Sequence, residues 1–273
     1  RFPTPALRIK FGSEHMTPLQ AYRLSVAVAC LSYASIKDLR TRTVNDAVWL
    51  AMVAAAAPAT AYEAYVGSFP TTLIAASVAL CFLLGLAAYY AGLFGGADML
   101  ALWAIGVSIP LYPRLPWTPL LGVAQPMLSL AVFNNTVALA ASTAIYVLLR
   151  NLAYKARGGA LFEGLEASRA TKALALLTGF KVKASEVNEH SHVFLLEEAV
   201  EAGKRLKVSH LARCSEKGVL GVRSEEKGWL GDEIWVAPAL PLVAYMLVGL
   251  VVALTVGDLV TTLIKWSLSL LPP

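Results

Sequence analysis

The stretch YYAGLFGGADMLALW, residues 89–103, places a single carboxylate in otherwise apolar sequence. No Lys, Arg, Asp or Glu occurs from Ala64 to Ala97, and after Asp98 none occurs until Arg114. Apolar runs of this length are typical of membrane-crossing helices, because a hydrocarbon core of about 30 Å takes about 20 helical residues. An ionisable group in such a run is costly, so Asp98 indicates a functional site.

Composition extends this interpretation to the whole chain. The 273 residues are 57% hydrophobic and only 15% charged, whereas soluble proteins average about 25% charged residues. Of the 41 charged side chains, 26 lie between Arg150 and Val236. The sequence therefore predicts an α-helical polytopic membrane protein with one soluble insertion.

Six transmembrane helices are predicted, over residues 18–37, 47–65, 71–94, 98–110, 127–149 and 238–256, the last with an alternative end at Leu271. Arg23 lies near the far end of the first helix, where its side chain is expected to snorkel to the interface. Residues 111–126 are rich in proline and are ill suited to a helix.

The predicted domains follow from this pattern. Residues 1–16 are expected to be a leader or a segment added for expression, and residues 17–149 the membrane domain with helices one to five. Residues 150–236 form the soluble insertion, and residues 237–273 carry the last helix and the C-terminus.

Basic residues indicate the orientation. The first loop carries Lys37, Arg40 and Arg42, and the insertion carries 14 Lys and Arg. Loops rich in Lys and Arg lie in the cytoplasm, and six helices place both segments there. Asp38 and Asp98 are then expected at the cytoplasmic ends of their helices, on one side of the membrane.

The insertion is predicted to be a small α+β domain. Residues 166–179 have helical spacing and end in Gly179, a favoured C-cap residue. Residues 180–187, 192–200, 205–213 and 228–238 have the alternation or β-rich composition of strands. His190 and His192 form an HxH pair, but exposed histidines are the favoured interpretation because no Cys or carboxylate cluster completes a zinc site.

Two lone carboxylates at one depth suggest the pair of an aspartic protease. There one ionised Asp draws a proton from water while its protonated partner donates to the peptide carbonyl. Gly95 and Gly96 lack Cβ atoms and allow a substrate to approach Asp98 closely. The glycines also predict a hinge that keeps the two carboxylates apart until substrate binds. The alternative is that each Asp only caps a helix.

The segment DLRTRTVNDAVW, residues 38–49, resembles the cytoplasmic signature of type IV prepilin peptidases and the archaeal preflagellin (pre-archaellin) peptidases. Their second motif, GxGD, is matched in its looser form by GGAD, residues 95–98, where Ala97 departs from the strict pattern. Leu100 stands where bacterial members often have Lys. The segment VAPALPL, residues 236–242, is similar to the proline-rich entry to the family's last helix.

The resemblance implies a membrane aspartic endopeptidase without metal or organic cofactor, active at the cytoplasmic face of the plasma membrane. Its expected partners are membrane lipid and pre-archaellin or prepilin-like substrates with a short basic, Gly-ended leader; nucleic acid is not expected. Paired CxxC motifs of bacterial methyltransferase domains are missing, so cleavage without methylation is expected. The implied roles are catalysis for Asp38 and Asp98, substrate approach for Gly95, Gly96 and Ala97, and loop orientation or lipid contact for Arg40, Arg42, Asn45 and Asp46.

Other function classes remain open at this point. An ion-coupled transporter predicts carboxylates near the bilayer midplane and an internal repeat, and the sequence shows no repeat. A non-catalytic assembly factor predicts that Asp38 and Asp98 tolerate replacement by Asn. A presenilin-like protease requires more than six spans, and no Tyr precedes Asp38.

Overall fold

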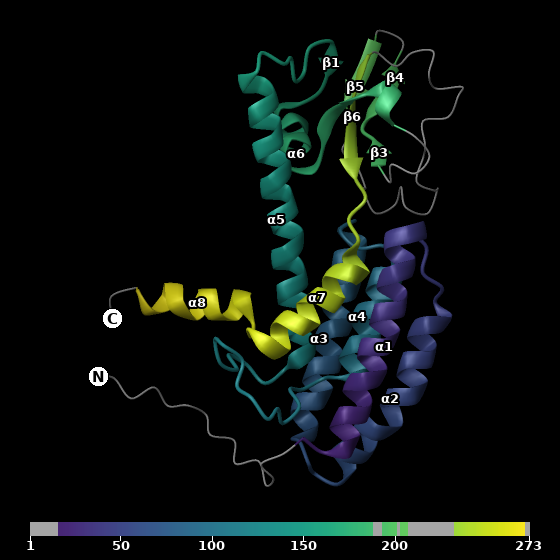
Figure 1. The fold of residues 1–273 in the computed structure, drawn as a ribbon, viewed down its shortest axis with the longest axis vertical. Coiled ribbons are helices and arrows are strands. Elements are labelled where there is room, and N and C mark those ends of the chain that lie inside the picture. Colours follow the sequence, from purple (N-terminus) through teal and green to yellow (C-terminus); the bar gives the residue numbers. More distant parts are fainter. Residues whose placement is uncertain (1–15, 188–192, 201–202, 207–231, 271–273) are drawn as a thin grey trace.

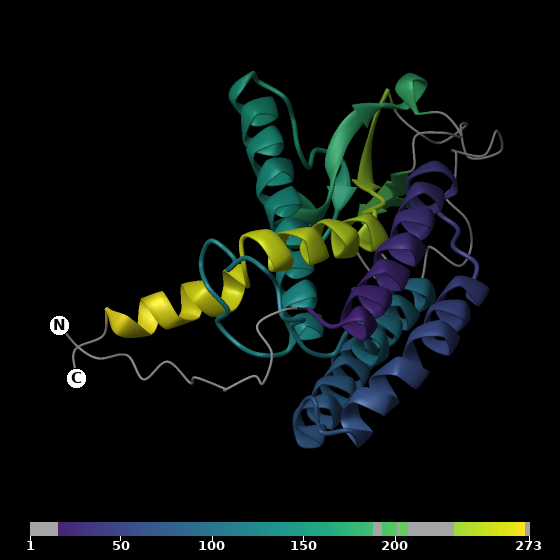
Figure 2. The ribbon, with the colours of Figure 1, turned by 60° about the horizontal axis from the view of Figure 1, so that its bottom comes forward.

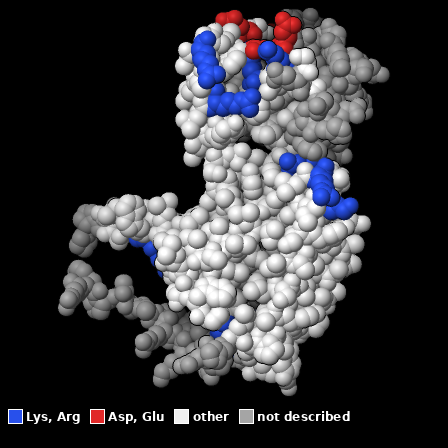
Figure 3. All heavy atoms as spheres, viewed as in Figure 1, with Lys and Arg blue, Asp and Glu red and all other residues white. Residues whose placement is uncertain are grey.

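The computed structural model describes residues 16–187, 193–200, 203–206 and 232–270. Figure 1 shows a helical bundle at one end and a small mixed domain at the other, joined by the long helix α5. In the space-filling view of Figure 3, charged side chains gather on the small domain and on the adjacent end of the bundle. Most of the bundle surface in that view is uncharged, as expected for a surface that meets lipid.

Four helices form the bundle: α1 (Pro18–Thr41), α2 (Ala47–Tyr65), α3 (Thr71–Tyr90) and α4 (Gly96–Ser108). Helix α1 packs against α2, and α4 packs against both α2 and α3. Small and aliphatic side chains such as Ala27, Leu31 and Ile105 are fully buried between them. Helix α2 has the predicted bounds, whereas α1 continues past Lys37, so that Asp38 lies within the helix.

Helix α5 (Leu128–Ala156) has 29 residues, a length of about 43 Å at 1.5 Å per residue. Its first half packs against α7 (Leu242–Thr255), and its far end carries the small domain. The short helix α8 (Leu259–Ser269) follows α7 at a bend of 55°. Figures 1 and 2 both show α8 extending away from the bundle.

Length and composition make α2, α3 and α5 candidate membrane spans, and α7 with α8 counts as a fourth if the bent pair crosses as one. The described residues therefore contain three to four candidate spans, fewer than the six predicted. Helix α1 carries Arg23, Lys37, Asp38 and Arg40, and α4 has only 13 residues, about 20 Å. Because α1 and α4 pack within the same bundle, the six-span topology stays a prediction.

Glycine and aspartate separate α7 from α8. Gly257 has φ +118°, and a Cβ there would lie 2.9 Å from the carbonyl oxygen of Gly122. Asp258 caps α8 by accepting a hydrogen bond from the N–H of Thr261 at 2.9 Å. The N–H of Leu120 donates to the carbonyl oxygen of Thr255 at 2.9 Å. The non-helical 109–127 connection thus satisfies a carbonyl that the end of α7 leaves open.

The insertion is an α+β domain, as predicted. It contains the strands β1 (Leu165–Glu166), β2 (Phe180–Lys183), β3 (Val193–Leu195), β4 (Glu197–Val200), β5 (Gly203–Leu206) and β6 (Glu233–Pro238), with helix α6 (Arg169–Thr178). The strands form two three-stranded sheets, in the orders β1-β5-β4 and β2-β6-β3. In the second sheet β6 is central and antiparallel to both neighbours.

Gly179 ends α6 as predicted, but for a different reason. Its φ of −145° is extended rather than left-handed. A Cβ at this position would lie 2.4 Å from Cδ1 of Leu196 and 2.8 Å from the carbonyl oxygen of Val236. Glycine is therefore required for close packing of the end of α6 on the sheet.

A buried ion pair lies at the other end of the bundle. Arg23 of α1 donates to Glu63 of α2, and both residues are nearly inaccessible, with 4% and 3% of their surfaces exposed. Arg23 also donates to the hydroxyl of Thr60 at 3.0 Å and to the carbonyl oxygen of Ser108 at 3.4 Å. The expectation that Arg23 snorkels is therefore wrong, because Glu63 supplies a partner inside the protein.

Candidate active site

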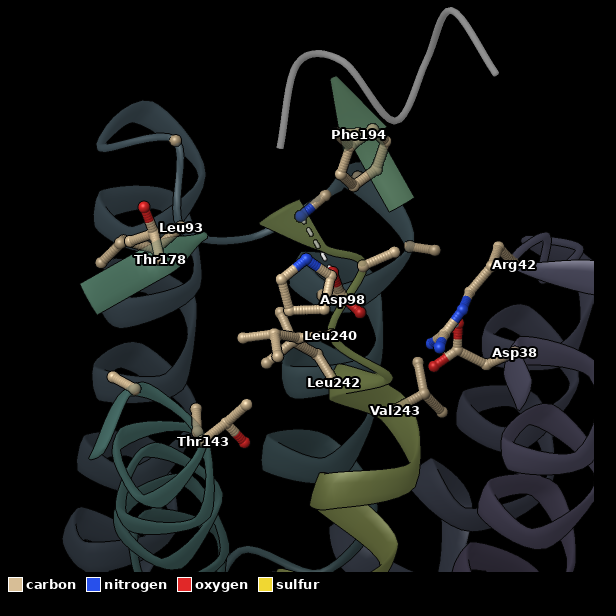
Figure 4. A pocket seen from close by; sticks show the side chains of 18 of the residues that line it. Asp38, Arg42, Leu93, Asp98, Thr143, Thr178, Phe194, Leu240, Leu242 and Val243 are labelled. Carbon is tan, nitrogen blue, oxygen red and sulfur yellow. Dashed lines mark hydrogen bonds and ion pairs between the residues drawn. The ribbon is translucent and has the colours of Figure 1, made fainter. Parts of the chain in front are cut away.

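A cavity of about 290 Å³ opens where the bundle meets the insertion. The end of α1, the α3–α4 connection, the start of α4, the middle of α5 and the start of α7 all contribute to its walls. Asp38 and Asp98 both line it, although 60 positions separate them in the sequence. Figure 4 shows the two carboxylates reaching the cavity from different helices, with Arg42 beside Asp38.

Asp38 lies one turn before the end of α1 and is buried, with 9% of its surface exposed. Its Oδ1 lies 3.9 Å from Nη1 of Arg42. A carboxylate near a helix C-terminus faces the negative end of the helix dipole, which is unfavourable. A capping role therefore does not explain Asp38.

Asp98 lies in the first turn of α4, where its Oδ2 accepts a hydrogen bond from the N–H of Gly95 at 2.9 Å. This contact caps the helix, and the carboxylate also faces the positive end of the dipole. Asp98 therefore caps α4. Because it also lines the cavity, its carboxyl group is available for a catalytic role as well. Asp98 is also close enough to Asp38 and Arg42 to interact with both charges.

The glycines before Asp98 differ in what they do. Gly92, φ +73°, ends α3: its N–H donates to the Tyr89 carbonyl, and the next N–H donates to the Ala88 carbonyl. This paired arrangement requires the left-handed conformation that glycine adopts readily. A Cβ on Gly95 would lie 3.2 Å from Oδ2 of Asp98, whereas a Cβ on Gly96 would meet no atom within 4 Å. Gly96 therefore leaves open space beside Asp98, in the cavity that it lines.

Replacing Gly96 with alanine is expected to reduce cleavage by about 10- to 100-fold without loss of stability. The added methyl group meets no protein atom and would fill space through which the expected substrate approaches Asp98, and small displacements of a reacting bond cost this much in rate. Steady-state kinetics and thermal unfolding of the purified variant measure the two effects. Gly92→Ala should instead mainly lower the stability, because alanine adopts the positive φ at this position only with strain. Wild-type kinetics for Gly96→Ala would remove Gly96 from the substrate path.

The other predicted site residues separate into two groups. Gly95, Gly96, Ala97 and Arg42 line the cavity with the two aspartates. Arg40, Asn45 and Asp46 are exposed and do not line it. The side-chain oxygen of Asn45 accepts from the N–H of Ala47 at 2.9 Å and so shapes the start of α2.

Arg42, for which loop orientation or lipid contact is expected, stands at an unusual backbone position. Among the residues described it is the only non-glycine with positive φ, at 53°. This conformation, uncommon for a side-chain-bearing residue, lies at the C-cap of α1. Arg42 lines the cavity, and its Nη1 lies 3.9 Å from Oδ1 of Asp38.

The insertion and the segment that follows it supply cavity residues that sequence reasoning did not assign. Leu177 and Thr178 come from the end of α6, Phe194 from β3, and Pro238 to Leu240 from the end of β6 and the segment that follows. Only the proline-rich 236–242 segment had a sequence signal. Leu177 and Phe194 had none, because their position depends on how the insertion packs on α5.

No metal centre is evident in the part of the chain that the structure describes, where no three His, Cys, Asp or Glu side chains gather. His190 and His192 lie outside the described residues.

Comparisons with known proteins cover most of the chain. Residues 25–150 match the type IV leader peptidase family, and this segment contains both Asp38 and Asp98. Residues 171–259 match the archaeal peptidase A24 C-terminus type II, a range that includes most of α6, the second sheet and α7.

Curated relatives agree with these matches. The preflagellin peptidase of Methanocaldococcus jannaschii is 26% identical over 234 residues, which cover 84% of this chain and 91% of that protein. The preflagellin peptidase of Methanococcus voltae is 22% identical over 256 residues, 88% of this chain and 97% of that protein. The preflagellin peptidase of Methanococcus maripaludis is 21% identical over 234 residues, 84% of this chain and 92% of that protein.

Proposed function

Because the chain belongs to the type IV leader peptidase family, we propose that it is a membrane aspartic endopeptidase that removes leader peptides from pre-archaellins or prepilin-like proteins. One observation carries the aspartic mechanism. Asp38 of α1 and Asp98 of α4 line the same cavity, although each is costly within apolar helices and Asp38 has no capping role.

The surroundings of the two carboxylates stabilise negative charge at both positions. The adjacent cation of Arg42 favours the ionised form of Asp38, and the N–H of Gly95 favours that of Asp98. Two like charges sharing one site disfavour ionisation of both, so in the proposed mechanism the pair shares one proton. The ionised member is the general base and the protonated member the general acid.

The proposed reaction needs no group beyond these two and water. The ionised Asp takes a proton from water as the water oxygen bonds to the peptide carbonyl carbon, and the protonated Asp donates its proton to the carbonyl oxygen. The first Asp then gives its proton to the amide nitrogen and the C–N bond breaks. As the carbonyl re-forms, its hydroxyl group returns a proton to the second Asp. The products are the carboxyl end of the leader and the new amino terminus of the mature protein.

The proposed substrate has a short basic leader ending in Gly, followed by a hydrophobic helix. Six transmembrane helices would place the first loop and the insertion, with its 14 Lys and Arg, in the cytoplasm. Cleavage would therefore occur at the cytoplasmic face of the plasma membrane, in contact with lipid. The absence of paired CxxC motifs from the sequence supports cleavage without methylation.

The direct test is to incubate membranes containing the protein with a tagged preprotein that bears a Gly-ended basic leader. Mass spectrometry of the products should identify one cut directly after the Gly. Membranes from the same host without the protein are the control. An uncut preprotein, with the enzyme shown to be folded, would exclude the proposed activity.

Chelators are expected to leave the activity unchanged. The proposed reaction uses carboxylates alone, so EDTA or 1,10-phenanthroline should remove nothing that it needs. Cleavage rates with and without chelator provide the measurement. Loss of activity that added zinc restores would instead implicate His190 and His192 and contradict the aspartic mechanism.

A further inference from the structure

The cavity has two kinds of wall. The membrane helices supply Asp38 and Asp98, and the insertion supplies a wall that is mainly apolar. We call the side chains of Leu177, Phe194 and Leu240 the apolar roof. All three line the same cavity as Asp98, and Figure 4 labels Phe194 and Leu240 in it.

The apolar roof is firmly held. The amide nitrogen of Asn151 in α5 donates to the carbonyl oxygens of Leu176 at 3.0 Å and Gly179 at 2.7 Å, which fixes the end of α6. Phe194 pairs with Ala237 in the register of β3 on β6. Helix α5 also lines the cavity, with Ala140, Thr143 and Val147. The same helix therefore forms part of the cavity wall and holds the apolar roof in place through Asn151.

The roof leaves apolar surface uncovered. Leu177 is 41% exposed and Leu240 is 37% exposed, beside a cavity rather than in a packed core. Among the described residues, the charged groups lining this cavity are Asp38, Arg42 and Asp98. The hydroxyl of Thr178 already donates to the carbonyl oxygen of Leu174 at 2.8 Å. The side chains of Leu177, Phe194 and Leu240 therefore offer neither a carboxylate for a basic side chain nor a side-chain donor.

The geometry points to a specificity site: we propose that the apolar roof binds the side chain of the first residue after the cleaved bond, and that this side chain is apolar. The three roof side chains carry no carboxylate that would pair with a basic leader side chain, and a Gly before the cut has no side chain to place against them. The volume of about 290 Å³ is at the low end for binding pockets and accommodates a few extended residues. This inference rests on the proposed function.

Two leucines of α6 give a matched test. Leu177 lines the cavity, whereas Leu174 is 52% exposed on the same helix and does not line it. Full-length enzyme with Leu177→Glu or Leu174→Glu is assayed on preproteins whose first residue after the cut is Ala, Leu or Lys. Both substitutions are at exposed positions, so folding is retained.

Wild type is expected to cleave the Ala and Leu substrates at least tenfold more efficiently than the Lys substrate, measured as kcat/KM. Leu177→Glu should lower kcat/KM for Leu about tenfold and raise that for Lys, because the new carboxylate pairs with it. Leu174→Glu should keep the wild-type ratios. Phe194→Ala should shift the preference toward larger first residues.

The outcomes separate the two proposals. Cleavage by wild type with unchanged ratios in Leu177→Glu and Phe194→Ala overturns the apolar roof as a specificity site and leaves the peptidase intact. A shift that follows the residue before the cut, instead of the one after it, also overturns the inference. Absence of cleavage by wild type on every substrate rejects the proposed function and the roof with it.

Discussion

Asp38→Asn and Asp98→Asn are each expected to reduce leader cleavage by on the order of 10²- to 10⁴-fold, the usual contribution of general acid–base catalysis. Asparagine has nearly the same shape as aspartate but neither takes nor supplies the proton. At position 98 the amide oxygen still accepts the hydrogen bond from the N–H of Gly95, so the cap of α4 is kept. Activity should therefore fall while the fold persists.

Purified variants, compared by cleavage rate and by thermal unfolding, provide the measurement. Asp46→Asn is the matched control, because Asp46 is exposed, lies outside the cavity and makes no side-chain capping bond. It should keep wild-type kinetics. Substantial cleavage by either Asp38→Asn or Asp98→Asn would remove that residue from the catalytic pair and favour the transporter or assembly-factor interpretations.

Arg23→Met is expected to destabilise the protein by about 3–5 kcal/mol, because it leaves the carboxylate of Glu63 buried without its partner. The double variant Arg23→Met/Glu63→Leu removes both charges and should recover most of that loss. Denaturant unfolding in mixed micelles measures the free energies of the single and double variants, and the cycle gives the coupling energy.

The exposed pair of Arg205 and Glu166, 3.7 Å apart, is the control, and breaking it by Arg205→Met should change the free energy by less than about 1 kcal/mol. Arg23 lies 15 residues before Asp38 on α1, about 22 Å along the helix. Cleavage per folded molecule should therefore be unaffected. Equal destabilisation by the single and double variants would show that the loss comes from the contacts that Arg23 makes, and not from leaving Glu63 buried without a partner.

Much of the bundle is predictable because its helix ends are set locally. Helix α2 has the predicted bounds, with Asn45 bonded to the first helical N–H and Gly67 at φ +70° just beyond its end. The break before α8 also has a local signal, a left-handed Gly257 followed by the N-cap Asp258. That pair of residues was available in the sequence but was not used to predict a separate helix.

The missed features depend on contacts between distant residues. Arg23 and Glu63 are 40 positions apart, and neither hydropathy nor periodicity indicates that they meet. Arg40 and Arg42 are equivalent in the sequence pattern, and only the left-handed end of α1 brings Arg42 back toward Asp38. The apolar roof likewise follows from the packing of α6 and β3 on α5 and β6.

The residues that line the cavity are synthesised one after another, because a ribosome makes a chain from its amino end. Both aspartates have been synthesised once residue 98 is complete, but the walls continue through Leu177, Phe194 and Leu240 to Val243. A ribosome that has not passed residue 243 therefore holds a chain with both carboxylates and an incomplete cavity. In the proposed peptidase, proteolytic competence would arise only after the insertion has folded and the start of α7 has been made, so shorter nascent chains would not cut neighbouring proteins.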